Sequence, residues 1–491
     1  MYMKKVAKSL FVLFFALGIT SCEDSYDIVQ KGELYDEDTF VVVNDLQRYL
    51  NGIYDGLESA NEIFLSSVLT DELGIAPSNG GNDRTLHRFL FNENSGYVSS
   101  IWAKDYRIIN RVNRLLEGAE NVPADTAPLL AQKNSILGQA RALRAYAYIN
   151  LLSYFSTDMS NPNALGVMIL DGVPTYGDTA PRVPNQLIFD IIDADIAFAV
   201  GNVTVPNASY KFVTQRMLSA MQARYNLYRG NYADAITHAT AAGAVLSAQL
   251  AYFNMWADSG QGETIFALDR PITGRGANIA SIYTFNATNL GGSPKFDMGR
   301  KLFNELEAIP NDVRFARFVD ASSKFGDYPN DPRPTSDDVL IIDKYPGKGN
   351  APLRNDIKVY RTSEMVLIRA EALVRQNPTD PTALANAATL VRNIRSSRRG
   401  ALHPAFVYAT AQQAYADILL ERRRELCFEG HRYLDLKRLG QLAGVAVDRD
   451  VYDYDGTPGP LTLPVTDFRF TCPIPISELL ANPTIVQNPG Y

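Results

Sequence analysis

The feature that most constrains the fold is a stretch of paired helical periodicity between Leu218 and Leu246. The residues are LSAMQARYNLYRGNYADAITHATAAGAVL, and the central Gly-Asn-Tyr predicts a turn between two helices. Small and aromatic residues recur on both sides of the turn at the spacing that lets two helices pack closely. They are Ala223, Gly230, Tyr232, Ala235, Ile236 and Ala239.

This pattern is typical of a tetratricopeptide repeat, and Ser363–Arg395 predicts a second helix–turn–helix unit of similar length. Such helix pairs stack, and together they bury a continuous core that no single pair can bury alone. The repeats are degenerate, and we expect about four pairs. The predicted fold is mainly α: tetratricopeptide-like helix pairs stacked as a superhelical scaffold.

Four more segments carry apolar residues at intervals of three and four, which predicts amphipathic helices. They are Asp45–Leu57, Ile101–Ala119, Asn134–Ser156 and Asn185–Val200. Three loop-rich insertions interrupt the scaffold, near residues 71–97, 252–356 and 441–491. Within the second insertion, ETIFALD and VLIIDKY predict short strands. Trp102 and Trp256 are predicted to be core residues.

The first residues predict a lipoprotein signal peptide over residues 1–21. Lysines precede the apolar run Leu10–Thr20, which is too short to span a bilayer. Cys22 follows Ile-Thr-Ser, an arrangement that resembles the lipobox of bacterial lipoproteins, in which this thiol is acylated. The acidic residues after Cys22 resemble an export signal of Bacteroidetes surface lipoproteins. The alternative is an ordinary secreted protein with a cysteine there by chance.

Composition and motifs argue against several functional classes. The net charge is −7 and no long basic stretch occurs, so we expect no nucleic-acid partner. No zinc-ligand spacing or G-x-S-x-G motif occurs, and we expect no enzyme activity. The acidic string Asp448–Asp455 lacks EF-hand spacing, which favours a solvated turn over a structural Ca²⁺. We expect no cofactor. Cys427 and Cys472 are compatible with a disulfide or with two buried thiols.

The segment Ile418–Gly440, ILLERRRELCFEGHRYLDLKRLG, resembles a helix of the SusD/RagB family of Bacteroidetes outer-membrane lipoproteins. Three further stretches resemble the same family in the same order: GQARALRAYAYINLLSYFS, YRTSEMVLIRAEAL and PIPISELLANPTIVQNPGY. Cys427 departs from the motif, where a small residue is usual. We interpret the Glu and Arg residues of the motif as structural, pairing along and between helices. The alternative is a carboxylate–arginine active site.

The resemblance implies a single SusD-like domain over residues 22–491. It also implies a lipid-anchored outer-membrane protein facing the cell exterior, which binds oligosaccharide and delivers it to a SusC-like TonB-dependent transporter. The same architecture carrying peptide is the main alternative. A surface glycoside hydrolase is disfavoured, and a purely structural repeat scaffold is a further alternative.

The candidate ligand-binding residues lie in two loop segments, the first of them in the place from which the family takes part of its ligand contacts. Aromatic rings can stack on sugar rings, and planar amide, carboxylate and guanidinium groups can bind hydroxyls. Solvated-loop or packing roles are the alternative for each residue. The candidates are Asp71, Asn79, Asn82, Arg84, Tyr97, Tyr283, Phe285 and Asn286.

Overall fold

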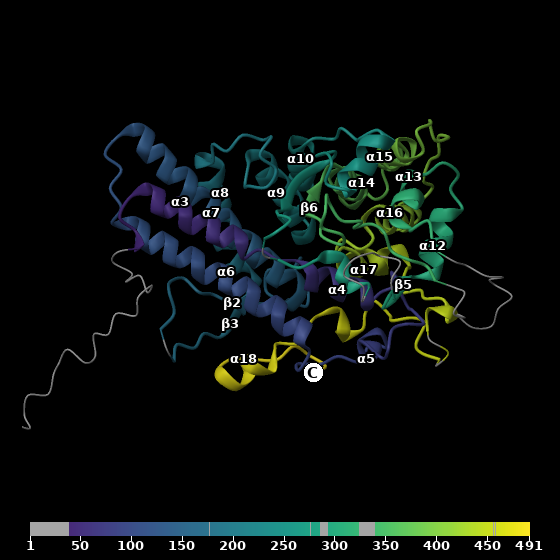
Figure 1. The fold of residues 1–491 in the computed structure, drawn as a ribbon, viewed down its shortest axis with the longest axis horizontal. Helices are drawn as coiled ribbons and strands as arrows, with labels where there is room; N and C mark the ends of the chain where they lie inside the picture. The colour runs from purple at the N-terminus through teal and green to yellow at the C-terminus, as the bar shows by residue number, and fades with distance from the viewer. Residues whose placement is uncertain are drawn as a thin grey trace, which may run out of the picture.

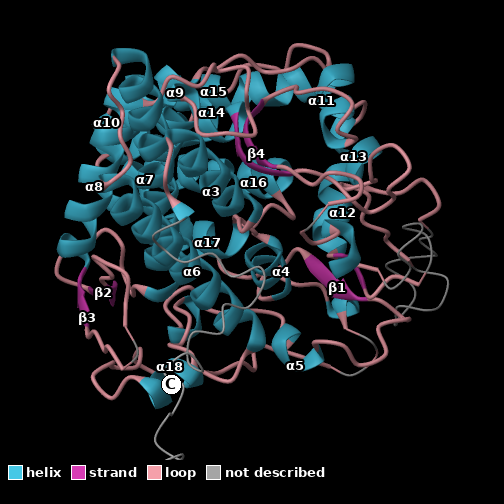
Figure 2. Cartoon of the chain, turned by 60° about the vertical axis from the view of Figure 1, so that its left-hand side comes forward, coloured by secondary structure: helices cyan, strands magenta, loops and turns pink. Residues whose placement is uncertain are grey.

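The computed structural model describes residues 39–491, apart from 176, 275, 285–292, 324–338, 455 and 457. The predicted signal peptide, Cys22, Phe285 and Asn286 therefore lie outside the described residues. Helices dominate the described chain, and its strands are short and form two-stranded sheets (Figure 1, Figure 2). The mainly helical prediction is confirmed.

The N-terminal helices gather at one end of the molecule, where α3, α6, α7 and α8 lie side by side (Figure 1). The two longest begin earlier than predicted. In α7 the Thr126 hydroxyl accepts a hydrogen bond from the Leu129 amide, and Pro128 occupies the first turn, so a capped start extends the helix. The elements are α3 (Val43–Asp55), α4 (Ala60–Val68), α6 (Gly96–Glu120), α7 (Ala127–Phe155) and α8 (Asn185–Asn202).

The predicted helix pairs form and stack. Gly230, at φ 82°, ends the first helix of the pair recognised from the sequence, and the small residues between the two helices are fully buried. α7 packs on α8, α9 on α10, α14 on α15 and α16 on α17, while α10 and α16 both pack on α14. The additional bounds are α9 (Gln215–Arg229), α10 (Tyr232–Ala242), α14 (Thr362–Gln376), α15 (Pro381–Arg399), α16 (Ala411–Leu426) and α17 (Arg432–Ala443).

The motif segment 418–440 differs from the expectation of one helix. It forms two helices, because α16 ends at Leu426 and α17 starts at Arg432. Between them Phe428 and Gly430 adopt positive φ angles of 61° and 86°, which reverse the chain. The Phe428 amide donates to the Glu72 carboxylate at 3.2 Å, so the turn is held by a contact distant in sequence.

The insertion near 252–356 contains more helix than predicted. ETIFALD forms a strand as expected, paired antiparallel with a strand at 357–361, whereas VLIIDKY forms no strand and contributes isolated bridge residues, among them Ile342, which pairs with Val319. The elements are α11 (Gln249–Trp256), β4 (Thr264–Leu268), η2 (Ile279–Ile282), β5 (Phe296–Met298), α12 (Arg300–Glu307), α13 (Val313–Phe318) and β6 (Ile357–Arg361).

The remaining elements are short and mostly lie in the connecting segments. They are β1 (Leu73–Ile75), α5 (Arg84–His87), β2 (Leu165–Met168), β3 (Arg182–Pro184), η3 (Val451–Asp453), η4 (Phe468–Phe470) and α18 (Ile476–Ala481). Trp102 and Trp256 are buried in the core, as predicted. Cys427 and Cys472 are both buried free thiols, so the disulfide alternative is not realised.

A buried ion network ties the C-terminal elements together around Glu425 of α16. Arg398 donates to both carboxylate oxygens at 2.9 and 3.0 Å. Arg361 donates to one oxygen at 3.0 Å, and Arg314 approaches the other at 3.4 Å. Burial alone would raise the pKa of Glu425, but Arg398 and Arg361 hold it well below its usual value. The motif residues pair between elements, in agreement with their structural interpretation.

We expect Glu425→Gln to lower the free energy of unfolding by roughly 3–5 kcal/mol, because it leaves buried guanidinium groups without their shared anion. Asp193→Asn is the matched control: it breaks a pair with Arg229 in which the aspartate side chain is 50% exposed. This change should cost at most about 1 kcal/mol. Denaturant unfolding measures both, and an equal loss in the two variants would contradict the central role of Glu425.

Candidate functional site

The part of the first candidate loop that follows β1 lies next to residues 293–295, which precede β5. β1 and β5 pair antiparallel, with Ile75 opposite Phe296, so the chain leaving β1 runs beside the chain entering β5. The Asn79 side-chain amide donates to the Lys295 carbonyl at 2.8 Å, which fastens one loop to the other. We name the exposed and half-buried part of this region the loop surface. It comprises Asn82, Asp83, Arg84, Tyr97 and Lys295.

The loop surface presents planar polar groups beside an aromatic ring. Gly80 and Gly81 adopt positive φ angles of 65° and 90°, and this tight turn leaves Asn82 and Arg84 exposed. The half-buried Tyr97 ring packs on Phe64 with ring centroids 4.8 Å apart. Amide, guanidinium and ring together are the groups that bind sugar hydroxyls and sugar faces.

Tyr97 is held in place by Asp83. Its hydroxyl donates to the Asp83 carboxylate at 3.0 Å. Partial burial and the negative charge of Asp83 raise the pKa of Tyr97, so the hydroxyl stays protonated and remains a donor. The ring orientation is therefore fixed before any ligand arrives, which lowers the entropy cost of binding.

Three predicted site residues point into the protein instead. Asp71 is buried and accepts two hydrogen bonds of 2.8 Å from Arg432. Burial would raise its pKa, but Arg423 and Arg432 lower it far below its usual value. Asn79 and Tyr283 are also buried, Asn79 bonded to Lys295 and Tyr283 packed on Phe428. These three residues hold the loop surface from beneath. Phe285 and Asn286 lie outside the described residues.

Sequence analysis did not predict two members of the loop surface, Asp83 and Lys295. Asp83 is adjacent to Asn82 in the string GGNDR, so its position alone could have suggested it. Lys295 is 216 residues from Asn79 along the chain, and no local pattern connects them. Only the pairing of β1 with β5 brings Lys295 to this surface.

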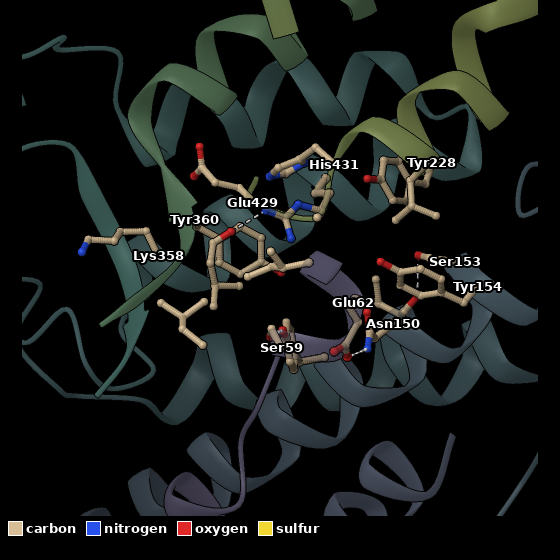
Figure 3. A pocket seen from close by; sticks show the side chains of 18 residues that line it. Ser59, Glu62, Asn150, Ser153, Tyr154, Tyr228, Lys358, Tyr360, Glu429 and His431 are labelled. Carbon is tan, nitrogen blue, oxygen red and sulfur yellow. Dashed lines mark hydrogen bonds between the residues drawn. The ribbon is translucent and has the colours of Figure 1, made fainter. Parts of the chain in front are cut away.

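An internal polar cavity of about 60 Å³ lies elsewhere, between α4, α7, β6 and the turn that joins α16 to α17. Figure 3 shows Glu62 and Asn150 on one side of it, with Glu429 and His431 facing them. Its volume suits a few water molecules, whereas small-molecule sites usually measure about 300–1,000 Å³. This cavity is too small for an oligosaccharide.

Glu62, which lines this cavity, shares the Asn150 side-chain amide with a second buried carboxylate, that of Asp105. The Asn150 amide donates to Glu62 at 3.0 Å and to Asp105 at 2.7 Å, and Lys104 forms ion pairs with both carboxylates. Burial raises the pKa of Asp105 to about 7, although Lys104 opposes the shift. A glycosidase acid pair must flank a sugar bond, and this pair is engaged inside the protein.

The acidic string 448–455 is partly engaged in the protein. The Asp448 carboxylate accepts from Lys301 at 2.6 Å, and Asp453 accepts from the backbone amides of Arg300 and Asp450. Asp455 lies outside the described residues. Within those residues, no three His, Cys, Asp or Glu side chains cluster closely enough to hold a metal ion. The calcium alternative stays an untested prediction.

Comparison with known proteins finds similarity to SusD-like proteins. The SusD family model matches residues 342–491. Two Formosa agariphila proteins are similar over nearly their whole length: SusD-like protein P38 at 25% identity, with 98% of each chain covered, and SusD-like protein P2 at 24% identity, with 100% of each covered.

Solved structures share the fold. A putative sugar binding protein from Bacteroides vulgatus superposes with a TM-score of 0.75 at 24% identity, covering 92% of this chain and 99% of the other. A laminarin binding SusD-like protein superposes with a TM-score of 0.68 at 22% identity, covering 92% and 100%. The C-terminal part of this chain, residues 342–491, matches the SusD family model, and the two relatives similar along the whole chain are SusD-like proteins. No helix between residues 39 and 491, where the structure describes them, is long and apolar enough to cross a membrane.

Glu72 links the loop surface to the scaffold. Its buried carboxylate accepts from the Ser67 hydroxyl at 2.7 Å and from the Phe428 amide at 3.2 Å. Burial raises its pKa to about 7, and the neighbouring charge of Asp71 adds to this rise. In the unfolded chain Glu72 would lose its proton near pH 4.5. The folded protein therefore binds one proton more than the unfolded chain between these two pH values.

We expect stability to fall as pH rises from about 4.5 to about 7, because the folded state must release the Glu72 proton there. Glu72→Gln should reduce this dependence by roughly 1–3 kcal/mol, and the part that comes from the raised pKa of Asp105 should remain. Urea unfolding of both proteins at pH 5 and pH 8 measures the difference. Glu58→Gln is the control, because the pKa of Glu58 is lowered in the folded protein and this residue therefore adds no such loss of stability between pH 5 and pH 8. Parallel pH profiles for wild type and Glu72→Gln would contradict the assignment.

Proposed function

We propose that this protein is a cell-surface lipoprotein that binds oligosaccharide at the loop surface and delivers it to a SusC-like TonB-dependent outer-membrane transporter. The observation that carries the proposal is that the exposed Asn82 and Arg84 flank Asp83, whose carboxylate holds the half-buried Tyr97 ring. A sugar ring stacks on the tyrosine face, and the amide and guanidinium bind its hydroxyls.

The relatives support a glycan rather than another cargo. One structural neighbour is named as a sugar binding protein and another as laminarin binding. The helix-pair scaffold supplies a rigid body on which a large partner can dock, while the loops supply contacts to the ligand. The protein captures cargo without transforming it, because the buried carboxylates are committed to arginine, lysine and amide partners.

Peptide cargo is the second candidate. The loop surface combines Asp83 with Arg84 and Lys295, so both signs of charge stand close together, as recognition of peptide side chains and termini requires. Titration with oligosaccharide and peptide panels separates the two candidates. Laminarin is the first glycan to test.

We expect Asn82→Ala combined with Arg84→Ala to weaken binding of the preferred oligosaccharide by roughly ten- to hundred-fold. This is the loss of affinity that corresponds to the net free energy of two hydrogen bonds. Arg48→Ala is the control, because this arginine side chain is 74% exposed on α3. Calorimetry measures the affinities. Unchanged binding in the double variant would place the glycan elsewhere, and new reducing ends during incubation would contradict the non-enzymatic assignment.

We expect Cys22→Ala to move the protein from the membrane fraction to the soluble fraction, because acyl chains on this thiol supply the anchor. Cys427→Ala is the matched control: it alters a buried thiol at a position where a small residue is usual in the family, and should leave the anchor intact. Fractionation and intact-mass measurement test both variants. A Cys22→Ala protein that stays membrane-bound would contradict lipidation at this residue.

A further inference from the structure

A second cavity, of about 400 Å³, lies where α7, α9, α14 and α17 meet. It is distinct from the loop surface and reaches solvent beside the exposed residues that follow α7 and end α17. Three cationic side chains line it against a single acid, Asp158. The cations are Arg375, Lys437 and Arg438.

Lys437 enters this cavity without a carboxylate partner. Its ammonium group donates to the carbonyls of Ser153 and Ser156 at 3.1 and 2.7 Å, which caps the end of α7. Among the described residues no carboxylate forms an ion pair with it. Two of its three N–H groups are used, so one donor and the whole positive charge remain.

Arg375 adds a second uncompensated charge. One nitrogen donates to the Tyr232 hydroxyl, while the buried Nη1 has no hydrogen-bond partner. No described carboxylate pairs with this arginine either. Arg438 differs, because its Nε and Nη2 pair with Glu371 at 2.8 Å, but its buried Nη1 also lacks a partner. Leaving buried donors unsatisfied is costly, which is a reason to expect an acceptor here.

The charge of the lining acid acts on Lys437, but this acid forms no ion pair with the three cations among the described residues. The Asp158 carboxylate accepts from the amide and the hydroxyl of Ser160 at 2.8 and 2.7 Å, within its own exposed turn. Thr157, Ser160, Tyr228 and Gln441 add hydroxyl and amide groups to the wall. The wall thus combines net positive charge with several neutral hydrogen-bonding groups.

We propose that this cavity binds a small hydroxylated carboxylate, the size of an acidic monosaccharide, whose carboxylate group contacts Lys437 and Arg375. The volume lies within the range of small-molecule sites and exceeds what a bare inorganic ion fills. The hydroxyls of such a ligand match the neutral groups of the wall. The proposal goes beyond the loop surface and does not depend on oligosaccharide binding there.

The charge state of Lys437 gives the site a pH dependence. Burial lowers the pKa of Lys437 to about 8, although the Cys472 thiol and Asp158 oppose the shift. Burial raises the pKa of Cys472 to about 12, so the thiol is neutral near pH 7, and the positive charge of Arg438 also faces the cavity. Anion binding is therefore expected below about pH 8 and should weaken above it.

The test titrates the full-length protein with glucuronate at low ionic strength and pH 7, with glucose as the neutral counterpart. We expect saturable glucuronate binding, no glucose binding, and at least tenfold weaker glucuronate binding at pH 9.5. Inorganic sulfate should compete, but more weakly than glucuronate. No saturable glucuronate binding, equal binding of glucose, or sulfate binding as tightly as glucuronate would overturn the proposal.

Substitutions test whether Lys437 and Arg375 contact the ligand. Lys437→Met and Arg375→Gln should each weaken glucuronate binding at least tenfold. Lys133→Met is the matched control, since Lys133 also donates to a backbone carbonyl, that of Val122 at 2.7 Å, but does not line this cavity. If Lys437→Met fails to fold, the half-buried Arg375 still decides the question. Unchanged affinity in Arg375→Gln would overturn the site, and Asn82→Ala with Arg84→Ala should leave glucuronate binding unchanged.

Discussion

One buried carboxylate, that of Glu425, joins arginines from three separate elements. Glu425 accepts from Arg361 and Arg398 and lies 3.4 Å from Arg314, and these residues come from β6, α15 and α13. A buried charge without partners would be prohibitive, so the elements can come together only in the arrangement that pairs them. The segment Glu421–Leu426 thereby helps to specify which elements meet, and the hydrophobic core fills the space between them.

The same segment also positions the loop surface. Directly after Glu425 the chain reverses, and its Phe428 amide holds the carboxylate of Glu72. Arg432, at the start of α17, donates two hydrogen bonds to the Asp71 carboxylate. Because Asp71 and Glu72 immediately precede β1, the network that orders the scaffold also fixes the start of the candidate binding loop. A rigid base beneath an irregular surface is what selective capture of a flexible glycan needs.

The buried charged groups fall into two sets: those paired within the scaffold and those that a ligand could contact. Carboxylates of the scaffold pair with Arg398, Arg361 and Arg314. Within the scaffold, too, Lys104 and Asn150 bind the carboxylates of Glu62 and Asp105. Lys437 and Arg375 stand out because they line a cavity and pair with no described carboxylate. Both side chains donate hydrogen bonds to carbonyl or hydroxyl groups of the scaffold, but these neutral partners do not neutralise the positive charges.

The helix pairs could be predicted from the sequence, because apolar periodicity and small residues such as Ala235 and Ala239 act over a few residues and need no distant partner. It also predicted Asn82, Arg84 and Tyr97 as ligand contacts, and the structure places these residues in the exposed and half-buried loop surface. Only the tertiary structure decided that Asp71 and Asn79 face inward, that Lys295 joins the loop surface, and that the motif breaks at Phe428. Each of these outcomes depends on a contact between segments far apart in the chain, and the polar pattern of a loop is the same whether its side chains meet water or a buried arginine.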